Sequence, residues 1–347
     1  MPSATAVVVY VGNSDTQDIS VFELGAEGTL APRATLAVQQ PVHPGRSMLM
    51  ATSPDRKFLY AGFLSDDAHS TAATYAIEPP SGLLSLLGKV QLPDIMSYLS
   101  VDRSGRFLLT ASYAGDKVVV NAIRADGTVG KTLQVRPTAP KAHCILTDPS
   151  NRTVLHTALG GDVICQDRFD ADTGALVPLD PPAIGVKAKA GPRFLIFSRD
   201  GRFVYVINEL DGSLDVFPFD TVHATLQPKS QATTVLPAGF SGRPWAADIH
   251  MTPDGRYLYG SERTSSTLAA FRVDPTNGTL TAIESFPTVR QPRAFSIDPS
   301  GKFLLSSGQL SNSIMSYSID ADSGRLDAIG EYPVGKNPTW VESVQLP

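Results

Sequence analysis

Short apolar runs alternate with polar turns along the whole chain. Runs such as 193–197 and 203–206 have the length and the β-branched and aromatic content of strands. In 313–319 apolar and polar residues alternate with a period of two, as in a strand with one buried face. A turn rich in Asp and Gly follows at 320–324. The pattern predicts repeating groups of four short strands.

One turn phrase recurs six times between the first and second strands of these groups. Each copy combines Pro, Asp, Asn or Gly, which suit the backbone angles of tight turns, with a basic residue. The basic residues follow one another at intervals of 46 to 54 residues: Lys57, Arg106, Arg152, Arg202, Arg256 and Lys302. Four strands in a repeat of this length are typical of a β-propeller blade. We expect these six side chains to be solvent-exposed.

The ends of the chain predict the number of blades. First strands are expected to start near seven residues: Ser47, Tyr98, His143, Arg193, Asp248, Arg293 and Trp340. Second strands are expected to start near seven others: Val7, Phe58, Phe107, Thr153, Phe203, Tyr257 and Phe303. The N-terminal run 6–11 is a second strand without a first strand before it. The C-terminal run 340–346 is a first strand without a second strand after it. The prediction is therefore an all-β fold, a single seven-bladed β-propeller domain over 1–347 with four antiparallel strands per blade, whose last blade is closed by both termini.

Composition narrows the choice of partner and compartment. With 42% hydrophobic residues, 18% charged residues and a net charge of −5, the chain is expected to bind neither nucleic acid nor an anionic membrane as its main partner. It lacks a run of about twenty apolar residues, and its first residues do not resemble a signal peptide, so the cytoplasm is expected. Cys144 and Cys165 do not have the spacing of a metal site. The protein is expected to be a monomer or a dimer.

The propeller topology brings polar residues together on one face. Loops that enter first strands and loops that leave second strands lie on the same side, because connections alternate between the two faces. First-strand entrances carry Arg46, Tyr98, His143, Arg193, Asp248, His250, Arg293 and Trp340, and second-strand exits carry Tyr113, Asn208, Glu209, Glu262, Arg263 and Gln309. Single arginines beside strands are often ordinary salt-bridge partners. Several converging arginines repel one another, so this face is expected to bind an anion or to hold neighbouring carboxylates.

Five phrases, in this order, resemble a known family. They are Gly191-Pro192-Arg193, Val206-Ile207-Asn208-Glu209-Leu210, Trp245-Ala246-Ala247-Asp248-Ile249-His250, Glu262-Arg263-Thr264 and Gln291-Pro292-Arg293. They resemble the seven-bladed lactonase family, which contains the bacterial propeller-type 6-phosphogluconolactonases and the fungal carboxymuconate-lactonizing enzyme. The resemblance covers nearly the whole chain. It implies an enzyme without a cofactor that opens a lactone ring, or forms one in the fungal branch, at the mouth of the central channel.

The resemblance also implies roles for particular residues. The histidine, two arginines and glutamate proposed for the family's chemistry are matched by His143, Arg193, Arg263 and Glu209. His143 would be the general base, with Glu209 as an alternative base or as its orienting partner, and the arginines would bind the developing oxyanion or the acid groups of the substrate. No metal is expected. Further substrate contacts are expected from Arg293, Asp248, His250, Tyr98, Trp245, Asn208 and Gln309.

Two departures from the bacterial enzymes bear on the substrate. A histidine often stands there in place of Tyr98, and an arginine in place of Pro244, just before Trp245. Losing a cation near the site weakens the case for a phosphorylated substrate. The expected substrate is therefore an anionic lactone that is either 6-phosphogluconolactone or a related aldonic or aldaric acid lactone. Three alternatives stay open: a muconate-type lactonizing enzyme, a non-catalytic scaffold for protein binding, and a calcium-dependent lactonase. The chain has no Trp-Asp dipeptide, and calcium-dependent lactonases have six blades.

Overall fold

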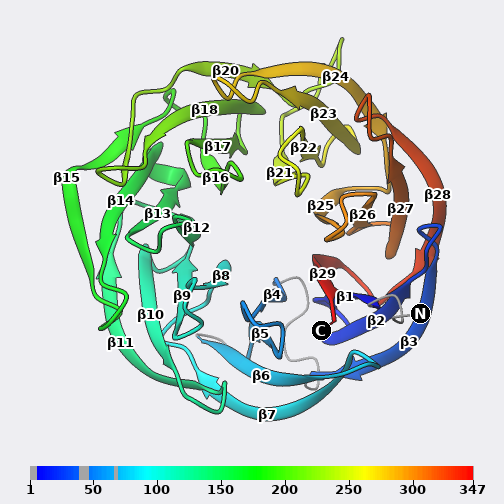
Figure 1. Ribbon diagram of the computed structural model, residues 1–347, viewed down its shortest axis with the longest axis horizontal. Coiled ribbons are helices and arrows are strands. Elements are labelled where there is room, and N and C mark those ends of the chain that lie inside the picture. The colour runs from blue at the N-terminus through cyan, green and yellow to red at the C-terminus, as the bar shows by residue number, and fades with distance from the viewer. Residues whose placement is uncertain (1–5, 39–46, 66–68, 347) are drawn as a thin grey trace.

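Seven antiparallel sheets surround a common axis in the computed structural model, which describes residues 6–38, 47–65 and 69–346 (Figure 1). The innermost strands are β4 (Leu49–Thr52), β8 (Tyr98–Val101), β12 (Ala142–Thr147), β16 (Pro192–Phe197), β21 (Ala246–Met251), β25 (Pro292–Ile297) and β29 (Pro338–Gln345). The second strands are β1 (Val7–Asn13), β5 (Phe58–Leu64), β9 (Phe107–Ser112), β13 (Thr153–Ala158), β17 (Phe203–Asn208), β22 (Tyr257–Glu262) and β26 (Phe303–Gly308). They begin at the seven residues predicted from the sequence.

The third and fourth strands complete each blade. The third strands are β2 (Asp18–Leu24), β6 (Ser70–Glu78), β10 (Lys117–Ile123), β14 (Val163–Phe169), β18 (Ser213–Asp220), β23 (Thr267–Val273) and β27 (Ser313–Ile319). The outer strands are β3 (Leu30–Ala37), β7 (Leu83–Gln91), β11 (Val129–Pro137), β15 (Leu176–Gly185), β19 (Thr225–Leu226) with β20 (Gln231–Thr234), β24 (Leu280–Pro287) and β28 (Leu326–Pro333). In one blade the outer strand is split into β19 and β20, and Pro228, which has no N–H to donate, lies between them.

Both ends of the chain build one blade, as predicted. Its strand order is β29-β1-β2-β3, and Val8 pairs with Val344 while Tyr10 pairs with Glu342. The seven-bladed propeller fold is therefore confirmed. The one helix in the described residues is a short 3₁₀ turn, η1 (Leu159–Gly161), and these residues contain no helix with the length and apolarity to cross a membrane.

The repeated turn phrase connects neighbouring blades. The six basic side chains are exposed, as expected, and three of them donate hydrogen bonds to the outer turn of the next blade. Arg202 donates to the carbonyl of Pro275 at 2.7 Å, Arg152 donates to the carbonyl of Thr221 at 2.5 Å, and Arg106 contacts the turn at 171–172. At three of its six copies the phrase thus ties one blade to the next as well as turning the chain.

The aromatic residue after the basic residue also reaches the next blade. Phe203 packs against Gly278, whose φ is +72°, in the turn between β23 and β24. A Cβ atom at Gly278 would lie 2.4 Å from the Phe203 ring, so no larger residue fits without a shift. Tyr205, two residues further along β17, donates its hydroxyl to the Gly278 carbonyl at 3.0 Å. The same aromatic–glycine contact recurs as Phe58 with Gly127, Phe107 with Gly174, Tyr257 with Gly324 and Phe303 with Gly28.

Candidate active site

β-Bulges near the start of three innermost strands place the candidate residues. The pairing register skips one residue at His143 in β12, at Arg193 in β16 and at Arg293 in β25. A bulge bends its strand and re-aims the extra side chain. All three residues line one cavity of about 270 Å³ on the face formed by first-strand entrances and second-strand exits. We call it the mouth cavity; its lining residues are Ser47, Leu64, Ser70, Ile95, Met96, Ser97, Tyr113, Ala114, His143, Arg193, Glu209, Trp245, Arg263 and Arg293.

Glu209 joins two of the three arginines in the mouth cavity. Its Oε2 accepts hydrogen bonds from Nε of Arg193 at 3.1 Å and from Nη2 of Arg263 at 2.7 Å. Both guanidinium groups also donate to backbone carbonyls of residues 245–247, at the start of β21. Both side chains are almost fully buried, with exposed fractions of 2% for Arg193 and 3% for Arg263. Such contacts hold the two planar groups in fixed orientations.

The mouth cavity carries excess positive charge. Arg293 donates to Oγ of Ser47, and among the described residues it forms no ion pair with a carboxylate. Among the described residues that line the cavity, three arginines therefore face one glutamate, a formal charge of +2. Asp248, which does not line this cavity, partly offsets the charges of Arg193 and Arg293. Burial, together with the charge of Arg193, lowers the pKa of Arg263 well below its usual value and that of Arg293 to about 10. An anionic ligand would relieve this repulsion.

His143 is a buried imidazole surrounded by these cations. Burial is the main cause that lowers its pKa well below 6.5, and the charges of Arg193, Arg293 and Arg263 lower it further. The side chain is therefore neutral at pH 7. Its Nδ1 is buried and has no hydrogen-bond partner among the described residues. The ring packs edge-on against Phe194, with ring centres 5.4 Å apart.

Trp245 forms part of the rim. The guanidinium of Arg263 lies 3.9 Å from the centre of its ring, a cation–π contact that supports the arginine from one side. The backbone N–H of Trp245 donates to Glu262 at 2.7 Å, which fixes the strand entrance. The residue is 38% exposed and lines the mouth cavity, so the indole can contact a bound ligand.

An aromatic layer separates the mouth cavity from a second cavity. Tyr98 packs against Phe194 and Trp340, with ring centres 5.0 and 5.4 Å away, and Phe194 lies 6.0 Å from Trp340. All three line the second cavity, whereas the residues just before the first two, Ser97 and Arg193, line the mouth cavity. The two cavities share no lining residue.

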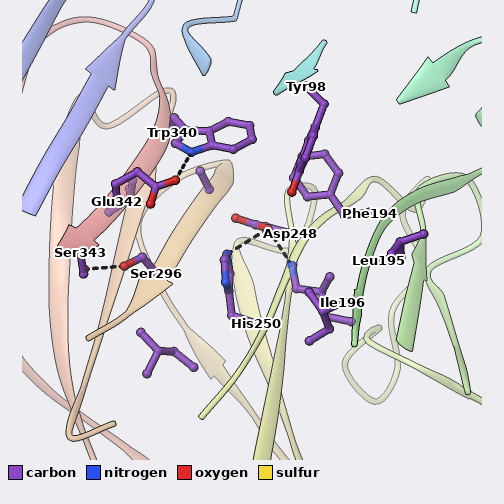
Figure 2. A pocket seen from close by; sticks show the side chains of 14 residues that line it. Tyr98, Phe194, Leu195, Ile196, Asp248, His250, Ser296, Trp340, Glu342 and Ser343 are labelled. Carbon is purple, nitrogen blue, oxygen red and sulfur yellow. Dashed lines mark hydrogen bonds and ion pairs between the residues drawn. The ribbon is translucent and has the colours of Figure 1, made fainter. Parts of the chain in front are cut away.

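The second cavity, of about 180 Å³, contains the other predicted contact residues (Figure 2). His250 lies 3.3 Å from Asp248, and Glu342 accepts a hydrogen bond from the Trp340 indole at 2.9 Å. Asp248 raises the pKa of His250 against the opposing effect of burial. Burial raises the pKa of Glu342 to about 7. The structure thus places Tyr98, Asp248 and His250 in a different cavity from the four predicted catalytic residues, although the charge of Asp248 still acts on Arg193.

The remaining predicted contacts lie outside both cavities. Asn208 is fully buried, and its side-chain amide donates to Ser213 and Asp215 within its own blade. Gln309 is hydrogen-bonded to Gln291 and Asn337 and does not line the mouth cavity. Arg46, also predicted at a first-strand entrance, lies outside the described residues.

Sequence reasoning missed the opposite wall of the mouth cavity, which is apolar or carries hydroxyls. Leu64, Ile95, Met96 and Ser97 form much of this wall. Their only signal in the sequence is position, since Ile95 to Ser97 directly precede the first strand at Tyr98. The cavity therefore has one cationic side and one weakly polar side. Among the described residues no group of three His, Cys, Asp or Glu side chains could hold a metal ion.

Comparison with known proteins finds lactonases among family profiles, protein sequences and solved structures. The profile of a family described as "Lactonase, 7-bladed beta-propeller" matches residues 5–343. A 6-phosphogluconolactonase of Pectobacterium carotovorum is 40% identical over 291 residues, which are 84% of each chain. One from Serratia proteamaculans is 38% identical over 84% of this chain and 85% of its own. The solved structure of a periplasmic gluconolactonase from Pseudomonas aeruginosa superimposes with a TM-score of 0.87 at 27% identity, covering 99% of this chain and all of that one.

Proposed function

From the premise that this chain belongs to the seven-bladed β-propeller lactonase family, we propose that its mouth cavity binds an anionic sugar-acid lactone and hydrolyses the ring. The expectation of a lactone-hydrolysing enzyme is confirmed at the level of the family. The first candidate substrate is 6-phosphogluconolactone, and related aldonic or aldaric acid lactones are the next candidates. That the protein is cytoplasmic and that it is a monomer or a dimer stay predictions.

The observation that carries this proposal is the positive charge of the mouth cavity, which nearby carboxylates compensate only in part. Among the described lining residues two of three buried arginines bond to the one carboxylate. Each of the three has a lowered pKa because its charge is buried, although Asp248 partly offsets the charge of Arg193 and Arg293. Such an arrangement is costly in the empty cavity and favourable once an anion binds. A scaffold for protein binding has no need of buried, mutually repelling cations.

His143 is the proposed general base. Because Glu209 is held by both arginines, we assign it to orienting them, which leaves the neutral imidazole to take a proton from water. A strongly lowered pKa makes a weak base. A bound anion would offset part of the charge that lowers this pKa, so the imidazole would become more basic when the substrate is present.

The reaction then follows from these positions. Water loses a proton to His143 and its oxygen adds to the lactone carbonyl carbon, and the resulting oxyanion is stabilised by Arg193 and Arg263. The intermediate collapses, the bond between the carbonyl carbon and the ring oxygen breaks, and the imidazolium returns the proton to the ring oxygen. The product is a hydroxy acid, which ionises and releases one proton to solution. Arg293 would hold a further anionic group of the substrate.

A pH-stat assay over a panel of lactones tests the proposal, with spontaneous hydrolysis subtracted. The panel contains 6-phosphogluconolactone, gluconolactone, aldarate lactones and a muconolactone. We expect the anionic sugar lactones to react fastest and His143→Ala to lose at least about a hundredfold in kcat, the range typical of a lost general base. Equal rates in His143→Ala, in Glu209→Gln and in the wild type would place the site elsewhere.

Arg293→Gln separates anion binding from a general loss of function. This variant is expected to raise KM for 6-phosphogluconolactone more than for uncharged gluconolactone. Arg202→Gln, an exposed arginine on the opposite face, is the matched control and should leave both values unchanged. Background rates across the whole panel would favour the scaffold, and activity confined to the muconolactone would favour a lactonizing enzyme.

A further inference from the structure

We propose that Thr157 is a positioning residue, whose single hydroxyl fixes His143 and Arg193 relative to one another. Thr157 belongs to β13, behind the mouth cavity, and is fully buried. It touches neither cavity, so it does not bind the substrate. The inference rests on the proposed function, because it concerns two residues of the proposed catalytic site.

The Thr157 hydroxyl bonds to backbone groups of two different blades. Oγ1 accepts a hydrogen bond from the N–H of Cys144 at 3.1 Å and donates one to the carbonyl of Arg193 at 2.7 Å. Cys144 directly follows the bulge residue His143 in β12, and Arg193 is itself the bulge residue of β16. One oxygen atom therefore joins the backbone at both bulges.

A hydroxyl is suited to this place because it can donate and accept at the same time. Ser261 and Ser307 are the hydroxyl residues behind the bulges of β21 and β25 in the described part of the chain, and each makes one bond within its own blade. Ser261 accepts from the N–H of Asp248 at 3.0 Å, and Ser307 donates to the carbonyl of Ala294 at 3.0 Å. Of these three, Thr157 is the one that connects two blades.

This connection matters because neighbouring blades meet through side chains and have no shared strand ladder at this point. The imidazole of His143 comes from one blade and the guanidinium of Arg193 from the next. If Thr157 loses its hydroxyl, the Cys144 N–H and the Arg193 carbonyl lose a common partner. The packing of His143 on Phe194 then holds the two bulges less precisely. A displacement of about 1 Å in a catalytic group can lower a rate by about a hundredfold.

Thr153 offers a matched control in the same strand. It is 1% exposed, and its hydroxyl donates to the carbonyl of Ala224 in the same neighbouring blade at 2.6 Å. Thr153 lies at the opposite end of β13, next to the repeated turn and away from the mouth cavity. Thr153→Val therefore removes a similar buried bond between the same two blades without touching the bulges.

The experiment compares Thr157→Val, Thr157→Ser and Thr153→Val with the wild type in two assays. In the first, Thr157→Val is expected to lower kcat on the best lactone at least about tenfold with a smaller change in KM. Thr157→Ser, which keeps the hydroxyl, should restore most of the rate. Thr153→Val should lower the melting temperature while kcat stays within about twofold of wild type. Equal kcat losses in the two valine variants would overturn the proposal.

The second assay needs no substrate. The ¹H–¹⁵N spectrum of the imidazole groups is recorded against pH, and the His143 signal is assigned by its loss in His143→Gln. Thr157→Val is expected to shift the titration of His143 toward that of an ordinary histidine, because the Arg193 charge moves, whereas Thr153→Val leaves it unchanged. An unchanged His143 titration in Thr157→Val would overturn the proposal even if no lactone is hydrolysed. A lactone panel with no activity but with this shift would instead refute the proposed function alone.

Discussion

The protonation state of His143 is set mainly by burial of its ring, and neighbouring cations add to the effect. Its ring is buried between Phe194 and Tyr113, and the three arginines of the mouth cavity add to the cost of placing a positive charge there. The active form in the proposed reaction is the neutral imidazole. Protonation, which would abolish activity, is therefore expected only at a pH well below 6.5.

The pH profile of kcat/KM tests whether His143 stays neutral to a pH well below 6.5. We expect the wild type to keep its activity from about pH 8 to below about pH 6, where a histidine with its usual pKa of about 6.5 would already be mostly protonated. Arg293→Gln removes one neighbouring charge, so its acidic limb should lie at higher pH. Initial rates corrected for spontaneous hydrolysis measure both limbs. A wild-type acidic limb near pH 6.5, or no difference between the two proteins, would contradict the prediction.

Glu342 makes the stability of the fold depend on pH, because burial raises the pKa of its carboxyl group to about 7. Between about pH 4.5 and pH 7 the folded protein binds this proton more tightly than the unfolded chain does, so this group lowers the free energy of unfolding as the pH rises. Glu342→Gln removes the effect. The free energy of unfolding of the variant, relative to that of the wild type, should therefore be higher at pH 8 than at pH 5, by roughly 2 kcal/mol.

Melting temperatures at the two pH values measure this difference. Glu27→Gln is the control, because Glu27 is exposed and its substitution should give the same difference from wild type at both values. Glu342→Gln keeps an acceptor for the Trp340 indole, so a change in packing is not expected. A difference from wild type that is independent of pH would refute the role given to the Glu342 charge.

At the scale of the element, the two ends of a first strand have different roles. The turn to the second strand joins neighbouring blades on one face through the basic and aromatic residues of the repeated phrase. The other end of the first strand carries the bulges that turn His143, Arg193 and Arg293 toward the mouth cavity. Stability and chemistry are thus concentrated at opposite ends of the same strands.

Gly278→Ala is predicted to destabilise the fold without altering the site. Gly278 has φ +72°, and a new Cβ would meet the ring of Phe203 at 2.4 Å. Backbone strain and overpacking together should cost roughly 2 to 4 kcal/mol. Chemical denaturation measures the loss, and kcat well below the melting temperature should stay at the wild-type value.

Gly185→Ala is the matched control for this change. Gly185 lies in the outer strand β15, where a Cβ would meet no atom within 4 Å and no positive φ is required. Its effect on the free energy of unfolding should stay within about 0.5 kcal/mol. Equal losses in the two variants would contradict the importance of the contact between Phe203 and Gly278.

At the scale of the whole molecule, the ring depends on pairing between the two ends of the chain. Strand β29 supplies the innermost strand of the blade whose other strands are β1, β2 and β3, and it also contributes Trp340 to the aromatic layer. Without β29 the ring would be open, and the inner edge of β1 would be unpaired.

A chain that ends at Asn337, before β29, is therefore expected to lose cooperative unfolding and to aggregate. Circular dichroism melting and size-exclusion chromatography measure this. The control is a circular permutant in which a flexible linker joins the native ends and new ends open in the exposed turn at Val222. It should melt within a few degrees of wild type. A cooperative, monodisperse truncated chain would show that ring closure is dispensable.

The placement of strands was predictable because it depends on local chemistry. Turn residues and apolar runs near each repeat located the second strands to the residue, and the unmatched runs at the two ends predicted the shared blade. The grouping of His143, Arg193, Glu209 and Arg263 on one face also followed, since connections in a blade alternate between faces. Their catalytic roles stay predictions.

The depth of each polar residue along the axis of the central channel was not predictable from the sequence. Tyr98 and Asp248 stand at strand entrances like Arg193, yet they line the second cavity, because bulges and ring packing decide which way each side chain turns. Asn208 directly precedes Glu209, yet it is fully buried. Periodicity in the sequence assigns a residue to a strand end, and a single skipped residue reverses the direction of its side chain.

The sequence by itself thus determined the number of blades, the closure of the ring and the face on which charged residues gather, because all three follow from short-range turn and strand signals repeated along the chain. Only the tertiary structure decided that two buried arginines share one carboxylate beside a third arginine, that an aromatic layer divides the channel residues into two cavities, and that Thr157 links two bulges. These features join residues far apart in the sequence from different blades. Their arrangement depends on packing between blades, which has no local signature.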